Sequence, residues 1–119
     1  MRGRLILAAL LVSGFDVAGS AQEQPPNRRE FDIVAEQYRF TPNRLEVAQD
    51  DLVKITLRSA DQPLSFAIDA YRIVKRVGAG RTVAFEFRAD RPGTFAFYCS
   101  MASDDRCKDM RGTLVVTGR

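Results

Sequence analysis

The sequence predicts an all-β sandwich of about eight short strands in a single domain. Three observations predict it: polar and apolar residues alternate, turn residues recur every eight to twelve positions or so, and helical periodicity is absent. Alternation is clearest in Val53, Ile55 and Leu57, which share one face of a strand and should be buried together. The strand-like runs span residues 31–35, 45–47, 52–58, 64–68, 71–74, 82–88, 94–98 and 113–117.

Turn-forming residues separate these runs. Thr-Pro-Asn stands at residues 41–43, Asp-Asp at 50–51, Gly-Ala-Gly at 78–80 and Arg-Pro-Gly at 91–93. Gly, Pro, Asn and Asp adopt turn geometries that strand interiors do not use. The chain therefore divides into short strands with no internal repeat.

Composition supports one globular domain and excludes several functions. A chain of 119 residues is too short for two domains, and 45% hydrophobic residues are enough for a real core. Histidine is absent, which excludes Ser-His-Asp hydrolysis, Cys-His proteolysis and any zinc site with a histidine ligand. The net charge of +3 is spread along the chain, so we expect no nucleic-acid partner.

The N-terminal segment has the pattern of a secretory signal peptide. Arg2 and Arg4 precede a short apolar run at residues 5–12, and small residues follow at 18–21. The run is too short to span a membrane. We therefore predict a signal peptide at 1–21, a flexible leader at 22–29 and a folded domain at 30–119. The mature protein should be periplasmic or secreted, without a membrane span, and monomeric.

Residues 30–117, essentially the whole predicted domain, resemble a known family, and the C-terminal part carries the clearest likeness. Residues 89–99 (ADRPGTFAFYC), followed after a loop by residues 110–116 (MRGTLVV), are similar to the cupredoxins, and residues 64–68 resemble an earlier strand of that family. The likeness is greatest to the copper domain of cytochrome c oxidase subunit II and of nitrous-oxide reductase. It implies a cupredoxin-like Greek-key β-sandwich that binds copper, with a possible electron-transfer role and a redox partner protein.

The copper ligands of the family are only partly present. Its binuclear loop reads C-x3-C-x3-H-x2-M, and this chain keeps the spacing through Cys99, Cys107 and Met110. Ser103 replaces the second cysteine, Cys107 replaces the loop histidine and Leu64 replaces the upstream histidine. A binuclear site is thus excluded, and a mononuclear blue site is excluded because it needs histidine.

Two hypotheses remain for the three sulfur-containing residues. Cys99, Cys107 and Met110 together offer soft donors that suit Cu(I), so the first hypothesis is one copper ion held by these residues. The second is a Cys99–Cys107 disulfide that stabilises a metal-free binding or structural module. An oxidising compartment favours formation of this disulfide. The two states exclude each other. A third, enzymatic possibility is thiol-disulfide exchange, but the cysteines lack the C-x-x-C arrangement that lowers a thiolate pKa, so we expect no enzyme.

Other candidate residues have simpler interpretations. Met101 would be an exposed loop methionine rather than a further copper ligand. Tyr38 and Phe40 should fill the core rather than form a partner surface. Four basic side chains are expected to lie in solvent at strand edges rather than to form a docking patch for a partner: Arg72, Lys75, Arg76 and Arg81.

Overall fold

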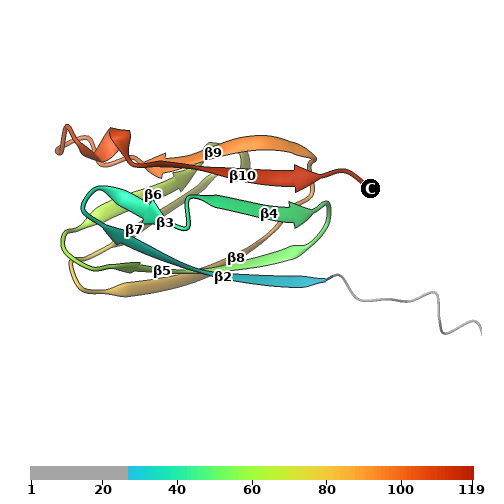
Figure 1. Cartoon of the computed structure of the whole chain (residues 1–119), viewed down its shortest axis with the longest axis horizontal. Coiled ribbons are helices and arrows are strands. Elements are labelled where there is room, and N and C mark those ends of the chain that lie inside the picture. The colour runs from blue at the N-terminus through green and yellow to red at the C-terminus, as the bar shows by residue number, and fades with distance from the viewer. Residues whose placement is uncertain (1–26) are drawn as a thin grey trace, which may run out of the picture.

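The structure, a computed structural model, describes residues 27–119 as two β-sheets packed face to face (Figure 1). The predicted signal peptide at 1–21 and most of the predicted leader lie outside the described residues. The first described strand, β2 (Arg28–Glu36), includes the last two leader residues, so the sheet begins slightly before residue 30. Within the described part, no helix has the length and apolar character to cross a membrane.

The two sheets confirm the predicted all-β sandwich. One sheet has four strands in the order β3-β2-β5-β8, and the other has five in the order β4-β10-β9-β6-β7. Strand β2 pairs in parallel with β5, and β4 pairs in parallel with β10. The remaining strands are β3 (Arg39–Thr41), β4 (Arg44–Ala48), β5 (Leu52–Ser59), β6 (Leu64–Ile68), β7 (Ile73–Val77), β8 (Thr82–Arg88), β9 (Gly93–Cys99) and β10 (Arg111–Thr117).

Two local elements differ from the sequence-based expectation. Strand β3 was not predicted, because it follows a tight turn at Gln37 and Tyr38 that lacks the usual Asn-Gly signal. Both turn residues nevertheless have left-handed backbones, with φ of 53° and 61°. Strand β7 begins at Ile73 rather than at residue 71, because Asp69–Tyr71 form a 3-10 helix, η3.

Aromatic rings from both sheets meet in the core. Phe40 on β3 lies 5.5 Å from Phe66 on β6 and 5.5 Å from Phe97 on β9, measured between ring centroids. Phe66 and Phe97 lie 5.3 Å apart. These spacings suit edge-to-face and tilted aromatic contacts. The expectation that Phe40 fills the core is confirmed, since it is buried with these rings.

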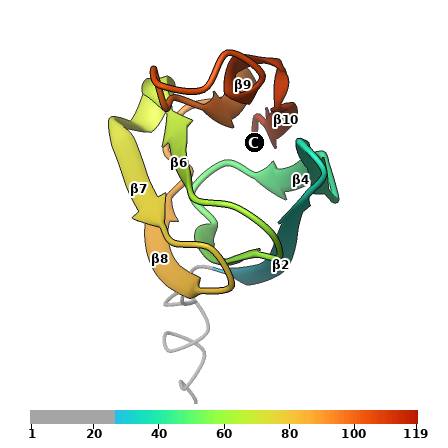
Figure 2. The ribbon, with the colours of Figure 1, turned by 90° about the vertical axis from the view of Figure 1, so that its left-hand side faces the viewer.

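One end of the sandwich gathers the segments around the predicted site. Strand β9 ends there at Cys99, and a loop containing the second 3-10 helix, η4 (Cys107–Asp109), leads into β10. The β2–β3 turn and the loop between β5 and β6 lie at the same end, which faces the viewer in Figure 2. Segments far apart in the sequence thus meet around one loop.

Candidate functional site

Cys99 and Cys107 form a disulfide at this end of the sandwich. Cys99 is the last residue of β9 and Cys107 the first of η4, with their Cα atoms 5.2 Å apart. Each cysteine is only 2% exposed. Of the two sequence hypotheses, the disulfide is therefore the state that the structure contains, and in this state neither sulfur is a thiolate.

Backbone hydrogen bonds hold the third predicted residue beside both cysteines. The Cys99 amide donates to the Met110 carbonyl at 3.1 Å, and the Met110 amide donates to the Cys107 carbonyl at 2.9 Å. Met110 is 4% exposed and belongs to the same core cluster as the two cysteines. The structure thus brings the backbones of the three residues together, whereas their role as metal ligands stays a prediction.

The donor set of the oxidised protein does not fit a copper ion. Disulfide sulfurs carry no thiolate charge, and the chain has no histidine. Within residues 27–119, no group of three or more His, Cys, Asp or Glu side chains is placed to hold a metal. Leu64, at the position of the family's upstream histidine, is buried at the start of β6. Only reduction would supply two thiolates, which together with a thioether suit Cu(I).

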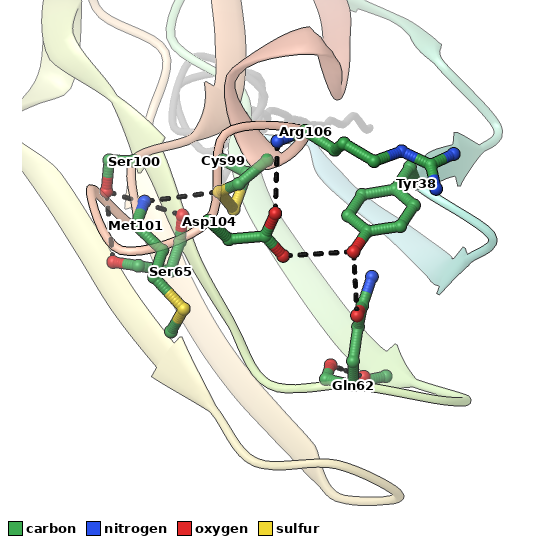
Figure 3. Close-up of a disulfide and its surroundings, with 10 residues drawn as sticks. Tyr38, Gln62, Ser65, Cys99, Ser100, Met101, Asp104 and Arg106 are labelled. Carbon is green, nitrogen blue, oxygen red and sulfur yellow. Dashed lines mark hydrogen bonds between the residues drawn. A yellow bond between two sulfur atoms is a disulfide. The ribbon is translucent and has the colours of Figure 1, made fainter.

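Met101 packs beside the disulfide. Its backbone amide donates a hydrogen bond to Cys107 Sγ at 3.2 Å (Figure 3). The side chain is half-buried and packs against the core, so the expectation of an exposed loop methionine was wrong. The reason is that the loop folds back over the start of β6, where the Ser100 amide donates to the Ser65 carbonyl at 2.6 Å.

A second contact ties the loop between Cys99 and Cys107, here called the disulfide loop, to the β2–β3 turn of the opposite sheet. The Tyr38 hydroxyl lies 3.1 Å from Asp104 Oδ2 and 3.0 Å from Gln62 Oε1, and it donates its single proton to one of them at a time (Figure 3). The Arg106 guanidinium lies 4.0 Å from the centroid of the Tyr38 ring. Asp104 Oδ1 also accepts the Arg106 amide at 3.0 Å.

Sequence reasoning missed this contact. It placed Tyr38 in the core, whereas Tyr38 is half-buried and joins two loops by its hydroxyl. Tyr38 and Asp104 are 66 residues apart, so no local pattern links them. The one available signal was chemical: a tyrosine at a domain surface usually finds a partner for its hydroxyl.

Next to Cys99, Tyr98 faces the outside of the sheet. Its hydroxyl donates to the carboxylate of Asp69, with distances of 2.9 Å and 3.1 Å to the two oxygens. This hydrogen bond raises the pKa of the Tyr98 phenol above its ordinary value, since losing the proton would place a phenolate beside the carboxylate. Tyr98 therefore remains a neutral donor well into alkaline solution.

Comparisons with known proteins agree with this architecture. The family model described as the cupredoxin-like domain matches residues 5–116. The chain therefore belongs to the cupredoxin-like domain family. This confirms the resemblance found in the sequence, including the missing histidine ligands. No curated protein matches this cupredoxin in sequence at a significant level.

Solved structures of copper proteins share the fold of this cupredoxin. The metal-binding domain of the Cu(I)-exporting P-type ATPase CopA of Streptococcus pneumoniae, solved with Cu(I), has a TM-score of 0.67 and 17% identity, covering 80% of this chain and 91% of that domain. Auracyanin A, a blue copper protein of Chloroflexus aurantiacus, has a TM-score of 0.64 and 18% identity, covering 76% and 100%.

A larger protein contains the same fold as one part. A chain of a heme-copper terminal oxidase has a TM-score of 0.64 and 15% identity, covering 74% of this chain and 64% of its own. This cupredoxin therefore spans under two thirds of that oxidase chain. At these identities, the likeness of all three structures establishes the fold alone.

Proposed function

We propose that this cupredoxin is an exported copper protein that binds Cu(I) only after its disulfide is reduced. One observation carries the proposal: the disulfide joins both cysteines of the chain, Cys99 and Cys107. These sulfurs are the only thiolates that the chain can offer to a copper ion, and it has no histidine to replace them. Copper binding would thus depend on the redox state of one bond.

After reduction, Cys99, Cys107 and Met110 are the residues we assign to the ion. Two thiolates and a thioether are soft donors, which favour Cu(I) over Cu(II) or harder ions. A copper ion held there would supply a one-electron couple, which a redox partner protein could use. The copper-bound domain of Streptococcus pneumoniae supports the proposal by its fold. The proposal includes no enzymatic activity.

Access to the disulfide supports reduction in the folded state. A hollow of about 400 Å³ opens on the loop and is bordered by Tyr98, Cys99, Met101 and Lys108, among others. Thiol-disulfide exchange needs an attacking thiolate to reach one sulfur in line with the bond. A small thiol could approach Cys99 through this hollow, although the cysteine itself is nearly buried.

Export is the second part of the proposal. Residues 1–21 have the pattern of a signal peptide, and disulfides form and persist in oxidising compartments. We therefore assign this cupredoxin to the periplasm or the extracellular space, where the oxidised form would be the resting state.

A metal-free structural or binding module is the alternative that a specific observation favours. Leu64 places hydrocarbon where the family has its upstream histidine ligand, and it is only 2% exposed. A buried leucine fills space without offering a donor. Under this alternative the disulfide has only a stabilising role. No copper is bound even after it is reduced.

Cu(I) titration of the protein recovered after secretion distinguishes the two. Oxidised and reduced samples, freed of reductant under anaerobic conditions, compete for Cu(I) with a chromophoric chelator. We expect reduced protein to take up one Cu(I), and both the oxidised protein and the Cys99→Ser, Cys107→Ser variant to take up none. Met110→Leu, which preserves volume, should weaken binding by about tenfold. If reduced protein takes up no more copper than the double variant, the metal-free alternative holds.

A further inference from the structure

Two adjoining hollows lie beside the disulfide loop and share Tyr38 and Arg39. The first, of about 660 Å³, is bordered by Arg39, Arg44 and Arg111. The second, of about 480 Å³, is bordered by Arg39 and Arg106. We call this surface the arginine groove, defined by Tyr38, Arg39, Arg44, Arg106 and Arg111. Its residues come from the β2–β3 turn, β3, β4, the disulfide loop and β10.

Most arginines of the groove have no carboxylate partner within the folded domain. Among residues 27–119, no carboxylate lies within 4 Å of the guanidinium groups of Arg39, Arg106 or Arg111. Arg44 is the exception, since its Nε lies 2.7 Å from Glu46 Oε2. Three guanidinium groups are therefore available to an external acceptor.

The acidic residues near the groove are already engaged, with one exception. Asp61 Oδ2 accepts the Gln37 amide at 2.8 Å. Asp104 accepts the Arg106 amide and lies beside the Tyr38 hydroxyl. Asp109, which also borders the first hollow, is the one opposing charge without such a contact. These hydrogen bonds leave the carboxylates charged, but four arginines and only two carboxylates, Asp61 and Asp109, line the two hollows, so the lining keeps a surplus of positive charge.

Stacking prepares Arg106 for a planar acceptor. Its guanidinium lies over the Tyr38 ring, 4.0 Å from the centroid, and points away from Asp104 (Figure 3). A guanidinium stacked on a ring keeps the N–H groups at its edge free, and these match the two oxygens of a carboxylate. Because the ring already restricts the side chain, less conformational entropy is lost when an acceptor binds.

The edge of a sheet lines part of the groove. β3 is the outermost strand of its sheet, with Arg39 and Thr41 exposed and Phe40 directed into the core. An extended segment can lie along such an edge, and its side chains on one face repeat about every 7 Å. Arginines distributed over two joined hollows fit several carboxylates in a row better than one small anion.

We propose that the arginine groove docks an acidic, extended segment of a partner protein. Recognition would come from carboxylates of the segment bound to Arg39, Arg106 and Arg111. The proposal is independent of copper, because none of these side chains is a sulfur donor. It assigns to this cupredoxin a protein partner that carries a run of Asp or Glu.

Binding of a labelled hexaglutamate peptide to the oxidised full chain tests the proposal, with fluorescence anisotropy as the readout. The groove variant is Arg39→Gln with Arg111→Gln. The matched control is Arg72→Gln with Arg76→Gln, which removes the same charge at or beside the edge strand β7, away from both hollows. We expect the groove variant to lose about tenfold or more in affinity and the control less than about twofold.

Three results would overturn the proposal. The first is no peptide binding by the unmodified protein at low ionic strength. The second is equal weakening by the groove and control variants, which would mean attraction to net charge alone. The third is displacement of the peptide by inorganic phosphate at equal concentration, which would indicate a small-anion site. Thermal unfolding of each variant checks that it is folded. A further variant, Arg39→Lys with Arg111→Lys, keeps the charge but not the planar guanidinium groups. It should bind the peptide with an affinity between those of the unmodified protein and the groove variant.

Discussion

The hydroxyl of Tyr38 lies 3.1 Å from Asp104 Oδ2, which joins the β2–β3 turn to the disulfide loop across 66 residues of sequence. The disulfide fixes the loop at its two ends, Cys99 and Cys107, and this contact fixes its middle. Both sheets of the sandwich thereby contribute to the position of one loop. The same tyrosine carries the stacked Arg106, so it serves the loop and the arginine groove together.

Removing the hydroxyl in Tyr38→Phe should loosen the loop. The ring and its packing remain, but Asp104 and Gln62 lose a hydrogen-bond donor. We expect the free energy of unfolding to fall by about 0.5–1.5 kcal/mol and the amides of residues 100–106 to exchange faster. Hydrogen exchange and urea denaturation measure the two effects.

Tyr71→Phe is the matched control. The Tyr71 hydroxyl also makes one hydrogen bond, to the Arg91 carbonyl at 3.2 Å, but it does not touch the disulfide loop. It should cost stability without changing exchange in residues 100–106. Unchanged loop exchange in Tyr38→Phe would show that the disulfide alone orders the loop.

The disulfide itself should contribute a substantial part of the stability. Cys99 and Cys107 are separated by 8 residues in sequence, and closing so short a loop restricts the unfolded chain. We expect Cys99→Ala with Cys107→Ala to lower the free energy of unfolding by about 2–3 kcal/mol. Urea denaturation of the oxidised protein and of the variant measures this difference.

Reductant supplies the control for the disulfide prediction. It should move the urea midpoint of the unmodified protein towards that of the double variant and leave the variant where it was. Equal midpoints for the oxidised protein and the variant would contradict a stabilising role for the bond.

The strands were predictable because their pattern is local. Alternation in β5 and β8 follows from residues that face the core at every second position, and it can be recognised within seven or eight residues. Strand β3 was missed for an equally local reason. Its turn at Gln37 and Tyr38 adopts left-handed backbones without the glycine or asparagine that usually marks them.

The candidate site was predictable only in part. The resemblance to the family's copper loop identified Cys99, Cys107 and Met110, and the structure brings their backbones together. The sequence alone did not decide between a disulfide and a copper site, because both need the same two cysteine sulfurs to lie close together. Tyr38 escaped notice because its contact with Asp104 depends on how two sheets pack, which no local pattern records.

Gly112 is needed for the close approach of β10 to the core. A Cβ atom at this position would overlap the ring of Phe97 and lie 2.8 Å from the Asn43 carbonyl oxygen. Neither neighbour can move freely, because Phe97 is fully buried and the Asn43 carbonyl accepts the Thr113 amide. Gly112→Ala should therefore destabilise the fold by about 1–3 kcal/mol, measured by thermal or urea denaturation.

Gly118→Ala tests whether the effect comes from overlap rather than from loss of a glycine. The nearest atom to a Cβ there is Cβ of Pro92 at 3.6 Å, an ordinary contact. We expect the free energy of unfolding of this variant to lie within about 0.5 kcal/mol of that of the unmodified protein. A similar loss in both variants would argue against crowding by Phe97.

The hydrogen bond from Tyr98 to Asp69 predicts a pH dependence at alkaline values. Because the bond raises the pKa of Tyr98 in the folded state, its contribution to stability is present below the ordinary tyrosine pKa. It is lost as the pH rises through the folded-state pKa. Asp69→Asn removes the carboxylate charge and should bring the pKa of Tyr98 down towards the ordinary value.

NMR shifts of the ring Cζ carbons, followed with pH, resolve the three tyrosines of the chain. Tyr71 is the internal control, because burial is the main cause that raises its pKa and Asp69 is not among the causes. Its titration should be the same in Asp69→Asn and in the unmodified protein. If Tyr98 also titrates unchanged in Asp69→Asn, the carboxylate does not hold its proton, and the contact between β9 and η3 would have to rest on packing alone.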